Sequence, residues 1–374
     1  MKIAIVSEDG LPDARVERIV KSLSKIYDEI YFIGLFKGFT LWDNPSKLVV
    51  KNINWGRFEN LVIEPYYYWL KRKISRELAG IKPDILIAVN LVAGKILDEL
   101  KYSFVLDYHE IWSLLLKYVS PRGVVRKLTY LRRRTLYPRL EELLLTKHPY
   151  ITVSSRAREY FIDKYGNSNS IVVENYPSID EVKHVSNIEA KGNNVVKSFC
   201  YVGKDLVFFD GHLSRDLRKT LNVLDDLWNR GFRFRVELIG SRDKIREYIE
   251  PRGWMKLIDI YGTICNVDFG IMSYNPIHIQ KYFSMNRFYT YVHSGVIPIA
   301  TDTFEQYVSK LKNYLITVES SNYEKSLMDK YVEAIAMDSE EIWRRKTKLI
   351  EYARVNYVWE NQENELLNFI KKYG

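Results

Sequence analysis

Long apolar runs, paired cysteines and glycosylation sequons are all missing from this sequence. The longest uninterrupted hydrophobic stretches are only five residues, at 66–70 and 85–89, whereas a transmembrane helix needs about 20. Cys200 and Cys265 form no C-x-x-C pair, and no N-x-[ST] triplet occurs. These absences disfavour a membrane-spanning or disulfide-bonded secreted protein. They predict a protein of the reducing cytoplasm.

Motifs of several common enzyme classes are also absent. The chain has no G-x-G-x-x-G, no G-x-x-x-x-G-K-[ST] and no H-E-x-x-H, which argues against dinucleotide, P-loop and zincin chemistry. A D-F-G triplet occurs at 268–270, but the other protein-kinase motifs are absent, so we interpret the triplet as a coincidence. Because no D-x-D triplet occurs either, a diphosphate leaving group would have to be stabilised by protein dipoles and cations. We therefore expect no metal and no cofactor.

The chain does have a surplus of positive charge, and it is concentrated in the first part. Residues 1–150 hold 25 Lys and Arg against 17 Asp and Glu, which accounts for most of the net charge of +9. Residues 111–140 contain eight basic residues and no acidic one. Such a stretch indicates an anionic partner or a solvated basic helix.

Within this basic stretch, helical spacing separates two faces. A basic and aromatic face contains Lys127, Tyr130, Arg134 and Tyr137. The expected packing side contains Val124, Leu128 and Leu131. A basic and aromatic face suits an anionic membrane surface, so we expect peripheral docking at the cytoplasmic side of a membrane, with a solvated face as the alternative.

Short apolar runs alternate with helical patterns along all 374 residues, a length that suits two domains. Strands are expected at 2–7, 29–35, 47–53, 84–90, 103–108, 150–154 and 170–175, and again at 198–203, 206–211, 234–240, 256–262, 267–274 and 296–301. Helices are expected at 13–25, 214–230 and 285–294 and over most of 321–374. This alternation predicts an α/β protein whose parallel sheets are covered by helices.

A polar segment at 176–196 interrupts the alternation and predicts an interdomain linker. We therefore expect two Rossmann-like, doubly wound domains facing a central cleft, at 1–178 and 197–356. An amphipathic helix at 357–374 ends the chain. In such sheets, ligands bind beyond the carboxyl ends of the strands.

Polar residues follow strand ends in the first expected domain. His109 and Glu110 come directly after the strand at 103–108, where a histidine could act as a base or a hydrogen-bond donor. Asp13 and Arg15 open the first helix after a loop that contains Gly10. The alternative for all of them is ordinary capping or surface placement.

The second expected domain has its own candidates. Ser284 could cap the helix at 285–294, and Arg287 in its first turn could bind a diphosphate together with the helix N-terminus. Arg215 and Lys219 surround another helix start. The alternative is an ordinary capped helix with solvated cations.

Seven segments, in order, resemble family-four glycosyltransferases of GT-B fold over essentially the whole chain. They include the D-x-R-V of residues 13–16, VLDYHEIW, ITVSS with VVENYP, VDFGIMSY, SMNRFYTYVHSGVIPIA and YVWENQENELL. Ser154 and Asn175 fall in the third and fourth of these segments.

The resemblance implies an acceptor-binding first domain, a nucleotide-sugar-binding second domain, transfer without a bound metal, and a final helix that crosses back to the first domain. On the acceptor side it implies Gly10, Asp13 and Arg15, with His109 and Glu110 at the reacting sugar. Arg215 or Lys219 would neutralise the departing phosphate. The donor would be bound by Gly240, Ser284, Asn286, Arg287, Tyr289 and Thr290. Many members carry Glu where this chain has Tyr282 and Thr290.

The sequence thus predicts a glycosyltransferase that moves a sugar from a nucleotide-diphosphate donor to an acceptor hydroxyl, with retention at the anomeric carbon. A lipid-linked glycan is the expected type of acceptor. A nucleotide-sugar epimerase of the same fold and a non-catalytic nucleotide-sugar-binding protein are the alternatives. Nucleic-acid binding is not expected.

Overall fold

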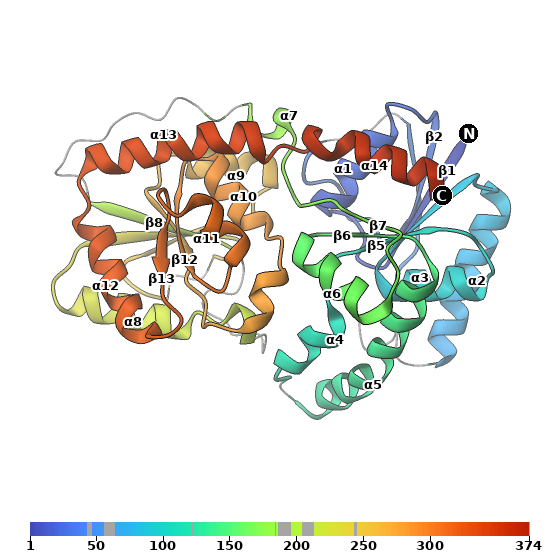
Figure 1. Cartoon of the computed structure of the whole chain (residues 1–374), viewed down its shortest axis with the longest axis horizontal. Helices are drawn as coiled ribbons and strands as arrows, with labels where there is room; N and C mark the ends of the chain where they lie inside the picture. Colours follow the sequence, from blue (N-terminus) through green and yellow to red (C-terminus); the bar gives the residue numbers. More distant parts are fainter. Residues whose placement is uncertain are drawn as a thin grey trace. The chain divides into compact units, whose positions relative to one another are not determined.

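Figure 1 shows the computed structural model, which describes residues 1–42, 47–55, 64–121, 123–183, 185, 196–203, 213–242 and 245–373. The chain divides into two compact units. The first contains Met1–Lys117, Pro121–Asn175 and Trp359–Gly374, and the second contains Tyr118–Ser120 and Tyr176–Val358.

Seven parallel strands form the sheet of the first unit, in the order β3-β2-β1-β4-β5-β6-β7. They are β1 (Lys2–Ser7), β2 (Glu29–Gly34), β3 (Leu48–Asn52), β4 (Ile85–Val89), β5 (Val105–Tyr108), β6 (Tyr150–Thr152) and β7 (Ser170–Val172). Every residue of β4 and β5 is buried, as expected for strands covered on both faces. All seven strands expected in this part of the sequence are confirmed.

Helices cover both faces of this sheet. They are α1 (Ala14–Leu23), α2 (Glu64–Ile81), α3 (Asn90–Glu99), the short α4 (Trp112–Leu115), α5 (Val124–Lys147), α6 (Ser155–Tyr165) and α14 (Glu360–Tyr373). The β1–β2 crossover runs opposite to the β4–β5 crossover, so right-handed connections place α1 and α3 on opposite faces. α14 packs beside α1 and β7 (Figure 1).

The second unit repeats this architecture with six parallel strands, in the order β10-β9-β8-β11-β12-β13. They are β8 (Lys197–Val202), β9 (Phe234–Ile239), β10 (Ile249–Gly253), β11 (Phe269–Met272), β12 (Ile297–Thr301) and β13 (Ile316–Val318). The helices include α7 (Ile179–Val182), α8 (Arg218–Asn229), α9 (Leu257–Ile264), α10 (Asn286–His293), α11 (Glu305–Leu311), α12 (Tyr323–Ala336) and α13 (Ser339–Asn356). Two doubly wound α/β units are therefore confirmed.

One expected strand is a helix. Residues 256–262 fall on α9, because Leu257, Ile260, Tyr261 and Ile264 are spaced for one helical face, and the last three of these are buried. The strands β10 and β13 were not expected from the sequence. The strand expected at 206–211 lies outside the described residues, as does most of the segment expected as a linker, namely 184 and 186–195.

The side of α5 that was expected to pack against the core is exposed instead. Val124, Leu128 and Leu131 are exposed, with 74, 63 and 62% of their surface open to solvent. Tyr137, expected outside, is buried, and Arg133 is fully buried. Helical spacing separates two faces but does not say which one packs. The expected exposure of Lys127 and Arg134 is confirmed.

The end of the chain returns to the first unit, as expected. The Trp359 indole donates to Ser22 Oγ at 2.8 Å in the interior. Gln362 exchanges hydrogen bonds with the backbone of Glu174, at 2.8 and 2.7 Å. Leu366 and Ile370 of α14 complete the core.

Candidate functional site

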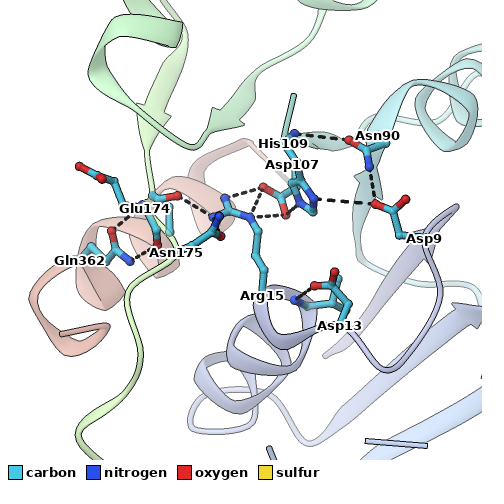
Figure 2. A network of polar contacts seen from close by, with 11 residues as sticks. Asp9, Asp13, Arg15, Asn90, Asp107, His109, Glu174, Asn175 and Gln362 are labelled. Atoms are coloured by element: carbon cyan, nitrogen blue, oxygen red, sulfur yellow. Dashed lines mark hydrogen bonds and ion pairs between the residues drawn. The ribbon is translucent and has the colours of Figure 1, made fainter. Parts of the chain in front are cut away.

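In both sheets the strand order reverses in the middle, between β1 and β4 and between β8 and β11. Such a switch point, at the carboxyl ends of the strands, is where open α/β sheets bind ligands. In the first unit a polar cluster occupies this edge (Figure 2). Asp9 follows β1, Asn90 follows β4, and Asp107 and His109 stand at the end of β5.

The centre of this cluster is a buried ion pair between Arg15 and Asp107. Arg15 Nη2 lies 2.7 Å from Asp107 Oδ1, and Nε lies 3.1 Å from both carboxylate oxygens. The remaining guanidinium nitrogen donates to the carbonyl of Val173 at 2.6 Å and to Asn175 Oδ1 at 3.3 Å. Burial alone would raise the pKa of Asp107, but the charges of Arg15 and His109 hold that pKa well below its usual range.

The ionised Asp107 in turn orients His109. His109 Nε2 lies 2.8 Å from Asp107 Oδ2. Burial lowers the pKa of His109, but the charge and hydrogen bond of Asp107 outweigh it, so that the pKa is raised overall. Nδ1 is left on the opposite side of the ring, 3.8 Å from Asp9 Oδ2. The imidazole can therefore present Nδ1 to a ligand, as an acceptor when neutral and as a donor when protonated.

Asn90 connects the other members of the cluster. Its backbone has a left-handed conformation, with φ of 67°, which is uncommon outside glycine. Its Oδ1 accepts from the His109 backbone N–H at 3.3 Å, and its Nδ2 donates to Asp9. The side chain of Asn90 thus fixes the loop after β1 to the end of β5.

Two adjacent carboxyl groups stand beside this bridge. Burial and the charge of Asp9 raise the pKa of Glu8 to about 8, against a hydrogen bond from the backbone of Val92. Desolvation and the nearby acids Asp13 and Glu110 also raise the pKa of Asp9. Water reaches 41% of the Asp9 side chain and partly screens these charges. The raised pKa makes Asp9 easier to protonate than an ordinary aspartate.

The other predicted residues of the first unit have structural roles as well. Asp13 is the N-cap of α1 and accepts from the Val16 N–H at 2.9 Å. Gly10 has φ of +77°, and a Cβ there would lie 2.7 Å from the carbonyl oxygen of Leu35. Glu110 lies in the bend after β5. All three guanidinium nitrogens of Arg15 bind protein atoms, so Arg15 holds Asp107 and the backbone of Val173 in place.

In the second unit Arg287 reaches the switch point from the first turn of α10. Its guanidinium lies 3.9 Å above the Tyr201 ring, and its Nε donates to the carbonyl of Val202 at the end of β8. The next residue is Gly203, where a Cβ would lie 2.4 Å from an Arg287 nitrogen. Glycine at this position therefore lets the cation sit against the strand end.

The start of α10 differs from the expectation. Its N-cap is Met285, not Ser284. The Met285 N–H donates to Tyr307 Oη at 2.6 Å, and the buried Ser284 hydroxyl lies 3.4 Å from Tyr289 Oη. The capping prediction was wrong because aromatic side chains from the core satisfy this helix start. Asn286 is exposed at the first helical position.

The remaining donor-side candidates are distributed around this edge. Tyr289 and Thr290 are buried, and the Thr290 hydroxyl donates to the Asn286 carbonyl at 3.0 Å. Lys219 pairs with Glu324 at 2.7 Å. Arg215 is exposed in the short turn 213–215. Gly240 directly follows β9 and has φ of +115°.

Sequence reasoning did not assign Glu8, Asp9, Asn90, Asp107 or Gly203 to the site. Each lies at or just beyond the carboxyl end of a strand beside a switch point. The order of the strands was the missing signal, because it decides which strand ends meet. Among the described residues, no group of three His, Cys, Asp or Glu side chains is arranged as metal ligands.

Comparison with solved structures gives matches over the whole chain. Sucrose-phosphate synthase from Thermosynechococcus elongatus has a TM-score of 0.68 at 12% identity, covering 100% of this chain and 98% of that one. WaaG, a glycosyltransferase involved in lipopolysaccharide biosynthesis, has a TM-score of 0.68 at 11% identity, with 97 and 98% coverage. The chain has the GT-B fold.

A third GT-B structure was solved with a nucleotide. HepE from Anabaena, in complex with UDP, has a TM-score of 0.62 at 12% identity and covers 100% of both chains. No family model and no curated protein sequence matches the chain. In the described part of this GT-B protein, no helix is both long and apolar enough to cross a bilayer.

Proposed function

We propose that this protein is a glycosyltransferase that moves a sugar from a nucleotide-diphosphate donor to an acceptor hydroxyl. The observation that carries the proposal is the match of the whole chain to a sucrose-phosphate synthase, to the glycosyltransferase WaaG and to a complex of HepE with UDP. The second unit would bind the donor and the first unit the acceptor. The polar groups at both switch points support this division.

Arg287 is the residue that we assign to the donor diphosphate. It lies at the carboxyl end of β8, beside Gly203 and next to the N-terminus of α10. A guanidinium beside the positive end of a helix dipole favours phosphate oxygens. Arg215 or Lys219 would neutralise the charge of the departing nucleotide, and Asn286 would add a polar contact.

His109 is the group that we assign to the reacting sugar. Asp107 fixes one ring nitrogen and Arg15 keeps Asp107 ionised, so only Nδ1 can change partners. A fixed imidazole can hydrogen-bond a sugar hydroxyl and stabilise charge that develops during transfer. Asp9 lies on the same side of the ring and would contact an acceptor hydroxyl or Nδ1.

We further propose that the transfer proceeds without a bound metal and retains the anomeric configuration, with cationic side chains stabilising the leaving diphosphate. Anomeric NMR of the product checks the stereochemistry, and an inverted linkage would contradict retention. We also propose a lipid-linked glycan as the acceptor, at the cytoplasmic face of an anionic membrane, because four basic residues of α5 are exposed, namely Lys127, Arg132, Arg134 and Arg139.

A thermal-shift screen of nucleotide sugars tests the donor assignment. We expect one donor to raise the melting temperature of the wild type and to bind Arg287→Ala about tenfold or more weakly, since a charge-assisted contact is lost. His109→Ala should keep donor affinity and lose turnover by about a hundredfold. His148→Ala is the matched control, because His148 also bonds an aspartate, Asp98.

Three outcomes of these assays would contradict the proposal. Normal turnover of His109→Ala would remove His109 from the reaction. A product of the donor's own mass, formed without acceptor, would indicate an epimerase. Donor binding with neither transfer nor hydrolysis would indicate a nucleotide-sugar-binding protein.

A further inference from the structure

The outward face of helix α5 carries an unusual stripe of apolar side chains. Val124, Leu128 and Leu131 lie on one side of the first two turns and are largely exposed. At about 100° per residue, all three fall within roughly 60° of arc. The opposite side holds the buried residues Arg133 and Tyr137, so the exposed stripe does not contribute to the core of the unit.

Cations border this stripe on both sides. The same angular reckoning places Lys127 and Arg134 on one flank and Arg132 and Arg139 on the other, roughly 50 to 90° from the middle of the stripe. All four residues are exposed. No acidic residue occurs anywhere from 111 to 140. An apolar stripe between two rows of cations is typical of a helix that lies in the surface of an anionic bilayer.

The position of the stripe relates it to the site. α5 ends at Lys147, just before β6, so its first turns point away from the amino end of β6 and toward the carboxyl edge of the sheet. His109 lies at that edge. α2 also begins there, and its first turns expose Tyr68 and Trp69, residue types that favour the membrane interface.

We propose that α5 docks this protein on an anionic membrane by inserting Val124, Leu128 and Leu131 among the lipids. The flanking cations then contact the headgroups. The inference rests on the proposed function in one respect: docking would bring the site to an acceptor that is carried by a lipid in the membrane. A second copy of the chain is a poor occupant of this face, because pairing two such helices would bring their cations together.

Flotation with phosphatidylcholine vesicles, with and without phosphatidylglycerol, tests the proposal. We expect the wild type to float with the anionic vesicles only. Leu128→Ser/Leu131→Ser keeps every cation but should bind these vesicles at least about tenfold more weakly, since two leucines lose their burial. Val355→Ser, which changes an exposed valine of α13 in the second unit, is the matched control and should bind like the wild type.

A charge variant separates insertion from attraction. Lys127→Gln/Arg132→Gln should weaken binding to anionic vesicles, and added salt should have a smaller effect on it than on the wild type. Because the four substituted side chains are exposed, the melting temperatures should be unchanged. Equal flotation of the wild type and the leucine variant would overturn the proposal. Self-association that the leucine variant abolishes, without vesicle binding, would overturn it in favour of a dimer face.

Measurement of donor binding without vesicles distinguishes a failure of membrane docking from a failure of the proposed function. The leucine variant should bind the nucleotide sugar as tightly as the wild type. Leucine-dependent flotation of a protein that binds no nucleotide sugar would support docking and contradict the proposed function. Transfer to a water-soluble acceptor by a protein that does not float would do the opposite.

Discussion

Asp107 joins two side chains with different tasks, the buried Arg15 and the partly exposed His109. The sequence places His109 after a strand, which is enough to suggest a site. It does not show that Arg15, 92 residues away, reaches the carboxylate of Asp107. Local spacing cannot reveal such a contact, because it depends on which strands become neighbours. Candidate residues at strand ends were therefore predictable, and their network was not.

At this scale we expect Asp107→Asn to lower the pKa of His109, because the neutral amide removes the charge that raises it. Turnover should fall by about tenfold or more, and stability by up to about 3–5 kcal/mol, since Arg15 stays buried without a counterion. NMR titration of the imidazole and thermal melting measure these effects. Asp98→Asn removes the aspartate partner of His148 and is the control. An unchanged pKa of His109 would contradict the assigned role of Asp107.

Glu8 gives a pH dependence with a definite sign. Its pKa rises from 4.5 to about 8 on folding, so the stability that it contributes is complete below pH 4.5 and is lost as the pH rises through about 8. Glu8→Gln should melt at the wild-type temperature near pH 4.5 and above it beyond pH 8. The exposed Glu159→Gln serves as the comparison. Parallel melting curves of Glu8→Gln and wild type across this range would show that Glu8 is not destabilised by its surroundings.

At the scale of helices and strands, alternation of apolar runs predicted most of both sheets. The failures have physical reasons. The strand expected at 256–262 falls on α9, because a short apolar run fits a buried helix as well as a strand. In α5, charge suggested the outer face, but Arg133 is buried and Leu128 is exposed. Tertiary packing decides the direction in which an amphipathic pattern faces.

The junction of β8 with α10 supplies a prediction at this scale. Gly203→Ala would place a Cβ 2.4 Å from an Arg287 nitrogen, and we expect the displaced guanidinium to weaken nucleoside-diphosphate binding by about tenfold or more. Calorimetry with the nucleotide measures this loss. Gly262→Ala, in α9 with no atom within 4 Å of its new Cβ, should leave affinity unchanged. Equal affinities of both variants would remove Arg287 from the donor site.

At the scale of the whole molecule, the first unit is built from both ends of the chain. Trp359 and α14 fill its core and hydrogen-bond Ser22 and Glu174. We expect deletion of residues 359–374 to unfold this unit. Deletion of the residues after Ile370 should leave the unit folded, because it removes no buried core side chain. The fragment 176–358 has its own core and should unfold cooperatively. Circular dichroism melting checks all three, and a stable first unit without α14 would contradict the assignment.

The contact between Glu174 and Gln362 brings the two ends of the segment 176–358 close together in space, although the two residues lie 188 positions apart in the sequence. The second unit is therefore an insertion in the sequence of the first unit, and the chain leaves and re-enters the first unit at neighbouring points. A short linker that joins residue 175 to residue 359 should allow the first unit to fold without the second. Under the proposed function, a second unit taken from another GT-B protein and inserted at the same two points should change the transferred sugar and keep the acceptor.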